Sequence, residues 1–323
     1  MKKKTLLVEK LVLLLMLFTV TKSFGQDANN SEKFTVTLLG TGTPMMSVER
    51  FGASTLVEAG DHKLVFDTGR GATIRLAQLG LFPGDIDAYF LTHLHSDHVN
   101  GLSDLWLTGW LFGRTEAMEI YGPVGTKNMM ERLREAHQAD IDIRVADENF
   151  PLSGIAVNAY EVSESLIYQE DGVRVTVFDV DHGELIKPSF GYRIDYQGSS
   201  VVISGDTRLS QNLIKFSQDA DVLVHEVMSI PAKLYSESEY WRSIMDHHTS
   251  PEEAGMIFTE TGVKLAVYSH IIVQGYADEK TGLNEVIHKT QAGYKGSFEI
   301  GYDLMSIEVS KTPKVLLFDS SQL

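Results

Sequence analysis

Short apolar runs that end in glycine, aspartate or histidine alternate with helical stretches over most of the sequence. The runs occupy residues 34–42, 63–69, 88–93, 174–182, 200–206, 222–226 and 264–270. Helical patterns occupy residues 71–80, 101–112, 126–139, 208–218 and 250–261, and residues 304–318 add one or two final strands. Buried strands placed between helices are typical of α/β proteins, in which helices cover the faces of a sheet. The pattern therefore predicts an α/β sandwich.

The first 25 residues differ in composition from the rest of the chain. Residues 2–4 are lysines, residues 11–20 are apolar, and residues 23–25 supply small side chains for a cleavage site. Because about ten apolar residues are too few to span a bilayer, a secretory signal peptide is favoured over an uncleaved anchor. We expect a signal peptide at 1–25, a short linker at 26–33 and a single domain at 34–323.

The cysteine count and the net charge indicate which cellular compartment and which kinds of binding partner to expect. The chain contains no cysteine, and an export signal without disulfides suits a bacterial periplasm or exterior. Removing residues 1–25 takes away five lysines and one glutamate, which shifts the formal net charge from −16 to −20. So acidic a chain, with no Lys and Arg cluster after the signal peptide, repels polyphosphates at long range. We expect an exported, periplasmic or secreted protein with no nucleic-acid partner and no stable membrane anchor.

The segment His93-Leu94-His95-Ser96-Asp97-His98 concentrates three of the eleven histidines and an aspartate in six positions. In an extended segment, residues two apart point to the same side, so His93 and His95 can bind one metal ion together. If the chain then turns into a helix, Asp97 and His98 face a second position. Imidazole and carboxylate ligands without thiolates suit zinc, manganese or iron. The alternative is a polar loop whose histidines are incidental.

The sequence "THLHSDH" at residues 92–98 resembles the metal-binding signature of the metallo-β-lactamase-fold hydrolases. Further segments resemble motifs of its ribonuclease Z and arylsulfatase-like branch, in the expected order: "LLGTGTP" (38–44), "DTG" (67–69), "YGPVGT" (121–126), "DHGELIKPSFGYRI" (181–194), "SGDTR" (204–208), "HHTSPEEAG" (247–255) and "YSH" (268–270). The resemblance spans roughly residues 34–271. It implies a four-layer αββα sandwich with a metal site at the edge between the two sheets.

The resemblance also implies a ligand set for two divalent ions, with zinc expected and Mn²⁺ or Fe²⁺ as alternatives. One ion is held by His93, His95 and His182, the other by Asp97, His98 and His270, and Asp206 bridges the two. The chemistry is consistent, because neutral imidazoles and a shared carboxylate leave open positions for a hydroxide between the ions. His182, Asp206 and His270 each end an apolar run, where a strand delivers a side chain to the edge of a sheet.

Three further side chains are assigned roles around these ligands. Asp67 is interpreted as orienting a ligand histidine through the free ring N–H, with a turn aspartate as the alternative. The resemblance places His248 near the leaving group, which makes it the expected general acid, with Glu226 as its orienting carboxylate. His247 competes for the same role. Asp97, His248 and Glu226 are therefore the expected catalytic residues.

The segments "HKLVFDTGRGATIRL" (62–76) and "SSVVISGDTRLSQNL" (199–213) share a local pattern. Each reads as a strand, then Asp-Thr, then a helix with an arginine near its start. The repetition suggests two similar halves that share one site between them.

The ligand set predicts a metal-dependent hydrolase that uses a hydroxide held between the ions, but it does not select the bond. The tRNA-processing members carry a long basic arm after the third-histidine segment, whereas only residues 195–200 separate "GYRI" from "VVISGD" here. We therefore expect a small ester substrate, cleaved by an arylsulfatase-like or phosphodiesterase-like activity. A lactonase-type or β-lactamase-type hydrolase is the main alternative. A tRNA 3′-processing endonuclease and a non-catalytic metal-binding protein are less favoured. The resemblance also leads us to expect a homodimer.

Two aromatic segments lie where the mouth of the site is expected. Residues 102–113 include Trp106 and Trp110, which are four apart on a helix and are expected to pack inward. Residues 228–245 include Tyr235, Tyr240 and Trp241, which offer an apolar wall for an aryl or acyl group.

Overall fold

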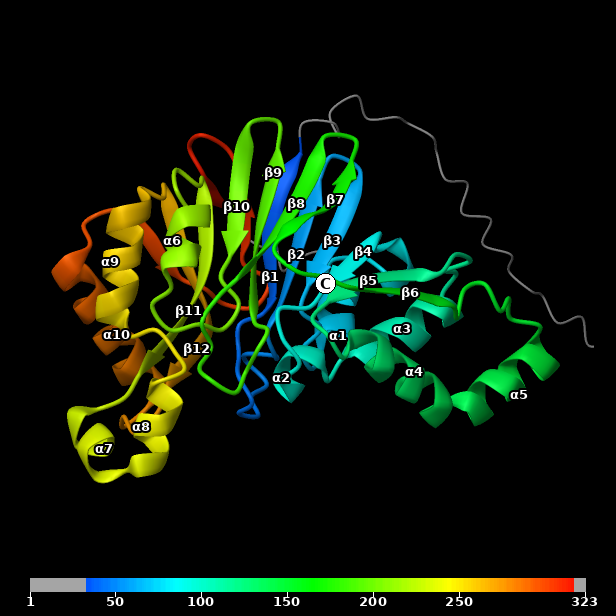
Figure 1. Cartoon of the computed structure of the whole chain (residues 1–323), viewed down its shortest axis with the longest axis horizontal. Coiled ribbons are helices and arrows are strands. Elements are labelled where there is room, and N and C mark those ends of the chain that lie inside the picture. Colours follow the sequence, from blue (N-terminus) through cyan, green and yellow to red (C-terminus); the bar gives the residue numbers. More distant parts are fainter. Residues whose placement is uncertain (1–32, 317–323) are drawn as a thin grey trace, which may run out of the picture.

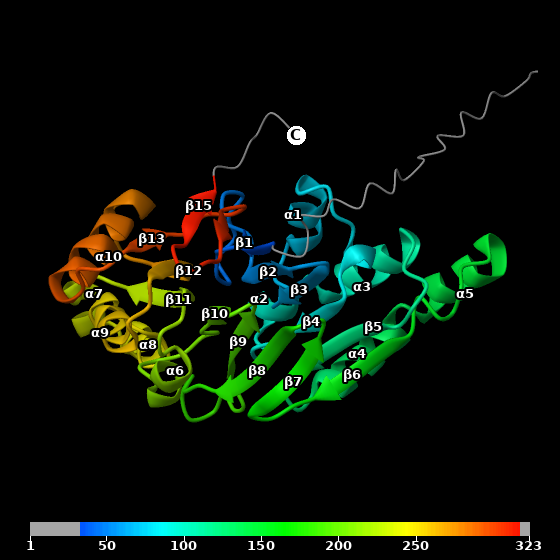
Figure 2. The same cartoon turned by 90° about the horizontal axis from the view of Figure 1, so that it is seen from above.

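The computed structural model describes residues 33–316, in which two β-sheets face each other and helices cover the outer face of each (Figures 1 and 2). This is the four-layer αββα arrangement that the sequence predicts. The proposed signal peptide and residues 26–32 of the linker lie outside the described residues. Within the described range, no helix has both the length and the apolar character needed to cross a bilayer.

The first sheet has eight strands in the order β15-β14-β1-β2-β3-β4-β5-β6. They are β1 (Phe34–Gly40), β2 (Ser54–Ala59), β3 (His62–Phe66), β4 (Ala88–Phe90), β5 (Met118–Gly122), β6 (Val157–Glu161), β14 (Ser306–Glu308) and β15 (Lys314–Leu316). The second sheet has seven strands in the order β13-β12-β11-β10-β9-β8-β7. They are β7 (Ser165–Glu170), β8 (Val173–Asp179), β9 (Phe190–Tyr196), β10 (Ser199–Ile203), β11 (Val222–Ser229), β12 (Leu265–Val273) and β13 (Phe298–Ile300).

The helices divide between the two outer layers and one end of the sandwich (Figure 1). They are α1 (Ala72–Gln78), α2 (Ser96–Val99), α3 (Leu102–Leu111), α4 (Thr126–Ala136), α5 (Gln138–Glu148), α6 (Gln211–Phe216), α7 (Ala232–Glu237), α8 (Glu239–Met245), α9 (Pro251–Thr261) and α10 (Glu279–Gly293), with a 3₁₀ turn at Pro83–Asp85. In Figure 1, α7 and α8 lie below β11 and β12, at the end of the sandwich that also carries α2.

Three apolar layers hold the sandwich together. Phe66, Phe90 and Tyr192 belong to the core between the two sheets. A second layer packs α1, α3, α4 and α5 on the first sheet and contains Trp106 and Trp110. A third packs α6, α9 and α10 on the second sheet. Strands with helices on one face and a sheet on the other are buried on both faces, which explains the continuous apolar runs of the sequence.

The predicted elements are found with small shifts, and the omissions have a physical cause. Helix α10 was not predicted, because the side chains it buries include Gly282, Val286 and Thr290, of which only one is strongly apolar. The strand that was expected to end at His270 continues to Val273. Helix α9 begins where its capping sequence indicates, since Ser250 and Glu253 form a reciprocal capping box.

The parallel strands position the site. Strands β3, β4 and β5 are parallel to one another, as are β10, β11, β12 and β13. Carboxyl ends of parallel neighbours lie at the same edge of a sheet, so loops that follow these strands in the two facing sheets converge at one end of the sandwich. The two similar segments of the sequence fit this arrangement, because Asp67 follows β3 and Asp206 follows β10 in the opposite sheet.

Candidate metal centre

The structure brings the seven expected ligand residues together from four separate segments of the chain. His93 and His95 lie in the loop after β4, and Asp97 and His98 lie in α2. His182 follows β8, Asp206 follows β10, and His270 lies within β12. Six of the seven side chains are at most 5% exposed, and His95 is the exposed member at the mouth. Their roles as ligands stay predictions, but their convergence is a property of the fold.

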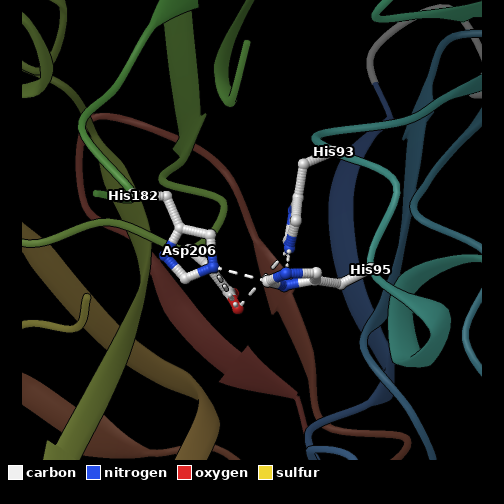
Figure 3. Close-up of side chains that lie close together, drawn as sticks. All are labelled: His93, His95, His182 and Asp206. Atoms are coloured by element: carbon white, nitrogen blue, oxygen red, sulfur yellow. Dashed lines mark hydrogen bonds and ion pairs between the residues drawn. The ribbon is translucent and has the colours of Figure 1, made fainter. Parts of the chain in front are cut away.

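The first set of donor atoms belongs to His93, His95, His182 and Asp206 (Figure 3). His95 Nδ1 lies 2.9 Å from His93 Nε2 and 3.4 Å from His182 Nε2. Asp206 Oδ2 lies 3.9 Å from His93 Nε2 and 3.8 Å from His182 Nε2. A tetrahedron of ligands about 2.05 Å from a zinc ion has edges of about 3.3 Å. The four donor atoms therefore surround a volume of the size that one such ion needs.

The second set belongs to Asp97, His98, Asp206 and His270. Asp97 Oδ2 lies 3.6 Å from His98 Nε2 and 3.1 Å from His270 Nε2. Asp206 Oδ2 lies 3.3 Å from each of the same two nitrogen atoms. The spacing again matches ligands around a small divalent ion. One carboxylate oxygen of Asp206 thus faces both sets.

Hydrogen bonds to the far side of the rings direct three histidines at the centre. His98 donates from Nδ1 to Asp67 Oδ2 over 2.7 Å, which leaves Nε2 facing the aspartates. His182 donates from Nδ1 to the carbonyl oxygen of His247 over 2.9 Å. His93 Nδ1 lies 3.0 Å from the hydroxyl of Thr92. Partners of this kind set the tautomer and the orientation of metal-binding imidazoles.

The loop that carries "HLHSDH" is held against the Asp67 turn. The backbone N–H and hydroxyl of Thr92 donate to Asp67, and the N–H of Thr68 donates to the carbonyl of His98 over 2.7 Å. Gly101 donates to the carbonyl of Thr68, and a Cβ on Gly101 would lie 2.5 Å from the carbonyl oxygen of Gly69. Glycine is required here because two backbone segments approach each other closely. Asp67 therefore orients His98 and also shapes the loop, a second role that the sequence did not reveal.

His270 reaches the centre from inside a strand, contrary to the strand end that the sequence predicted. The pairing of β11 with β12 shifts register between His225 and Val227, and His270 has a positive φ of 43°. A β-bulge adds a residue to one strand and re-aims its side chain. This irregularity turns the imidazole of His270 toward Asp97 and Asp206.

One buried polar atom without a hydrogen-bonding partner faces the second donor set. Among the described residues there are nine unpaired side-chain atoms of this kind, and one of them, His98 Nε2, lies 3.3 Å from Asp206 Oδ2 and 3.6 Å from Asp97 Oδ2. Native proteins leave few buried polar atoms unpaired, so this nitrogen beside two carboxylates indicates a missing partner such as an ion. The donor set of imidazoles and carboxylates fits a divalent metal such as zinc.

The electrostatics of the centre favour positive charge between the aspartates. Burial lowers the pKa of His182 to about 4, and burial also lowers the pKa of His93 well below its usual value. Both imidazoles are therefore available as neutral ligands. Burial opposes protonation of His98 as well, but Asp206 and Asp67 outweigh it and raise its pKa well above the usual value. The two aspartates attract a cation to this position.

Glu226 and His248 form a second arrangement beside the ligands. His248 Nδ1 lies 3.3 Å from Glu226 Oε1, and that oxygen also accepts the backbone N–H of Thr249 over 2.9 Å. Burial alone would lower the pKa of His248, but the adjacent Glu226 carboxylate raises it above its usual value. Burial lowers the pKa of His247, whose ring has no carboxylate contact like that of His248 among the described residues. The structure thus gives His248 the carboxylate partner that the sequence assigned to it.

A cavity of about 190 Å³ opens onto the centre. Its lining includes five ligand residues together with His247, His248, Tyr240, Trp241, Ile244, Ile272, Gln274 and residues 43–45. Trp106 and Trp110 are fully buried in the helical layer, as their spacing predicts. Tyr235 is exposed outside the cavity lining. The contributions of Met45 and Ile272 were not predicted, because nothing in their local sequence indicates contact with α8.

The connection between β9 and β10 is a two-residue turn at Gln197 and Gly198, since Tyr196 pairs with Ser199. Both turn residues have positive φ, as a tight β-hairpin requires. No arm extends from this position.

Comparisons with known proteins agree with the fold. The family model described as "Anti-Pycsar protein Apyc1" matches residues 34–239. Ribonuclease Z from Mycobacterium sp. (strain KMS) is 33% identical over 276 residues, which cover 85% of this chain and 95% of that protein.

Two solved structures share the fold. Human tRNase Z, short form, has a TM-score of 0.65 and 22% identity over 85% of this chain and 99% of that chain. The metallo-β-lactamase fold protein YhfI from Bacillus subtilis has a TM-score of 0.63 and 19% identity over 85% of this chain and 98% of that chain. The chain therefore belongs to the metal-dependent hydrolases of the metallo-β-lactamase fold, in their ribonuclease Z-like branch and in the family of the anti-Pycsar protein Apyc1.

Proposed function

We propose that this hydrolase cleaves phosphodiester bonds in small substrates. One observation carries the proposal: the cavity that has His248 in its wall also has the metal-ligand residues as its floor. A nucleophile generated at the floor and a proton donor in the wall then act on the same bound ester. This arrangement supports hydrolysis with assistance to the leaving group.

Two divalent ions, zinc in our proposal, would occupy the two donor sets. His93, His95 and His182 would hold the first, Asp97, His98 and His270 the second, and Asp206 both. Bound there, they would polarise the ester and lower the pKa of a water molecule to near neutrality. Asp97 would belong to the second set and would also face the nucleophile.

The chain's own groups supply the remaining chemistry. His248 would protonate the leaving oxygen from the ring nitrogen that faces away from Glu226. Glu226 would keep His248 oriented and favour its protonated form, because the two side chains lie 3.3 Å apart at Oε1 and Nδ1. His247 would serve chiefly through its backbone carbonyl, which accepts the hydrogen bond from His182.

The relatives favour a phosphodiester over the other esters that such a centre cleaves. The matched curated proteins are named ribonuclease Z, and a ribonuclease acts on phosphodiester bonds. Sulfate esters remain within the same proposal as an arylsulfatase-like side activity. Lactones and β-lactams are alternative substrates that the same hydroxide chemistry serves.

RNA is the second candidate substrate. We expected no nucleic-acid partner, but the match to ribonuclease Z over 95% of its length is unfavourable to that expectation. The tight turn between β9 and β10 and the formal net charge of −16 argue in the other direction. Precursor tRNA cleavage is therefore a defined alternative outcome of the assay below.

A substrate panel tests the proposal. The purified protein is loaded with Zn²⁺ or Mn²⁺ and assayed on bis-p-nitrophenyl phosphate, a cyclic mononucleotide, p-nitrophenyl sulfate, an acyl-homoserine lactone, a β-lactam and a precursor tRNA. We expect the highest kcat/KM on a small phosphodiester and complete loss of activity in EDTA. Turnover only on the lactone, the lactam or the tRNA would overturn the proposal.

We further propose that the protein is exported through residues 1–25 and that it forms a homodimer. The basic start, apolar segment and small residues at 23–25 support export. N-terminal sequencing of the protein from fractionated bacterial cells tests this, and a start at residue 26 is the expected result. Sedimentation of the purified protein tests the homodimer.

A further inference from the structure

The wall of the active-site cavity differs chemically from its floor. Tyr240, Trp241 and Ile244 of α8 line the cavity together with Ile272 of β12, on whose apolar cluster Trp241 and Ile244 pack, and Met45 lines it from the loop after β1. Tyr240 is 65% exposed, and its ring meets the Trp241 ring edge to face with centroids 5.2 Å apart. Large aromatic side chains that stay exposed beside a catalytic centre are typical of a surface that binds a ligand.

The described lining of this cavity contains no lysine and no arginine. Its uncharged polar members are Thr43 and Gln274. Arg208, a basic residue near His247, is held by Asp181 with Nε 3.0 Å from Oδ2. An anionic group bound against the wall would therefore lose its hydration without gaining a side-chain cation, which is unfavourable.

A second hollow that shares His95 has a different character. Its lining includes Lys187 together with Leu94, Val124 and Leu185. The two hollows thus differ in charge, since one has Asp97 and Asp206 and the other has Lys187, and the donor residue His248 belongs only to the hollow without lysine. Since a general acid protonates the leaving oxygen, the leaving group occupies the hollow that contains His248.

We propose that Tyr240, Trp241, Ile244 and Ile272 form a leaving-group subsite that selects phosphodiesters with an uncharged, planar leaving group. This inference rests on the proposed phosphodiesterase function and adds its substrate class. The aromatic wall covers the faces of the ring, and Thr43 and Gln274 supply neutral hydrogen-bonding groups for its polar edge. A leaving group that carries further phosphates, as an RNA chain does, is disfavoured by the same wall.

The wall residues of α8 do not pack in the large core layers, so they can be substituted without changing the metal-ligand residues. Trp241 and Ile244 pack on a small apolar cluster with Met228 and Ile230, apart from the three large core layers. Tyr240 lies outside that cluster and is the most exposed of the wall residues of α8. A substitution at Tyr240 is therefore expected to leave the fold and the metal centre intact.

Two diesters that differ by one charge on the leaving group test the inference. Methyl 4-nitrophenyl phosphate and methyl 3-carboxy-4-nitrophenyl phosphate are assayed with the wild-type protein, Tyr240→Ala, Tyr240→Lys and the control Tyr235→Ala. Because one added charge in an apolar pocket is strongly disfavoured, we expect the wild type to prefer the uncharged leaving group by about tenfold or more in kcat/KM. Tyr240→Lys should reduce that ratio to about threefold or less by offering a cation. Tyr240→Ala should raise KM for the uncharged diester, and Tyr235→Ala should behave as the wild type.

A binding measurement separates this inference from the proposed function. Of the three tryptophans, Trp241 lines the described cavity, so the difference in 4-nitrophenol quenching between the wild type and Trp241→Phe reports on that residue. In EDTA-treated protein we expect this difference to saturate as the 4-nitrophenol concentration rises. If neither diester is hydrolysed, the function proposal fails while quenching still decides the subsite. Equal kcat/KM for the two diesters, or a quenching difference that does not saturate, would overturn the subsite.

Discussion

The floor and the wall of the active-site cavity show two ways of placing functional side chains. At the metal centre beside this floor, His93, His98 and His182 are 1% exposed, and each has a hydrogen-bond partner on the ring nitrogen that faces away from the centre. On the wall, Tyr240 is 65% exposed and belongs to a helix of seven residues. The metal centre is positioned by polar contacts from the loops after β3, β4 and α8, whereas the wall depends on one small apolar cluster. The expected metal ligands are therefore held by buried hydrogen bonds, whereas the residues that we propose to select the substrate lie on a more exposed helix.

The largest expected loss of activity follows the substitution of Asp206, which faces both donor sets. Asp206→Ala should reduce kcat/KM by about a thousandfold or more and lower the bound metal, because a shared carboxylate disappears. His182→Ala should act in the same direction. Metal analysis and kinetics measure both effects, with Asp195→Ala on β9 as the matched control. Full activity with unchanged metal content in both variants would show that these residues do not hold metal.

The next effect separates the two adjacent histidines in the wall. His248→Asn should lower kcat by about 10²–10⁴-fold with unchanged metal content, because proton donation is lost. His247→Asn keeps the backbone carbonyl that His182 needs and should cost less than about tenfold. Measuring kcat and metal content for both variants tests the assignment. An equal loss in both would favour a shared role over a single donor.

A smaller effect is expected at Asp67, which contacts the expected ligand His98. Asn tolerates the positive φ of 59° at residue 67, so Asp67→Asn preserves the turn. Loss of the carboxylate behind His98 should weaken metal affinity by about 10–100-fold. Competition with a chelator measures the affinity. Activity should recover at saturating metal, and failure to recover would indicate that Asp67 shapes the loop more than it supports the ligand.

The smallest effect lies at the other end of β11, away from the cavity. Burial would raise the pKa of Asp221, but Lys264 and Lys311 outweigh it and lower the pKa below the usual value. A carboxylate with a lowered folded pKa stabilises the protein above its unfolded pKa of about 3.9, and the contribution is lost as pH falls through the folded value. Asp221→Asn should therefore cost about 1.5–3 kcal/mol at pH 7. Urea unfolding at several pH values should show this difference shrinking in the acid range while activity per folded molecule is unchanged. A pH-independent difference would exclude the ion pair as its cause.

Most of the floor could be predicted because its residues follow a local pattern. Each of His93, His182 and Asp206 comes a few residues after a buried strand, and parallel strand ends converge at one edge of a sheet. His270 was expected from the family resemblance, but its position inside a strand was not, since a bulge depends on the pairing with β11 and has no signature in the local sequence.

The wall was predicted only in part. Tyr240 and Trp241 were expected near the mouth, but Ile272 and Met45 come from segments whose local sequence gives no sign of contact with α8. The partners of the wall lie in β12 and in the loop after β1, so only the packing of α8 could reveal the cavity. The packing of α8 also explains why the described lining of the cavity contains no lysine and no arginine.

The pattern of strands and helices in the sequence by itself determined the sandwich, and the resemblance of its motifs to the metallo-β-lactamase-fold hydrolases implied the seven donor residues and the roles of His248 and Glu226. The tertiary structure decided three further features: the two roles of Asp67, the bulge that aims His270, and the charge difference between the two hollows. Each of these depends on contacts between residues far apart in the chain, which no local pattern encodes. The sequence therefore indicated metal-dependent hydrolysis, whereas the proposed leaving-group subsite depends on tertiary packing.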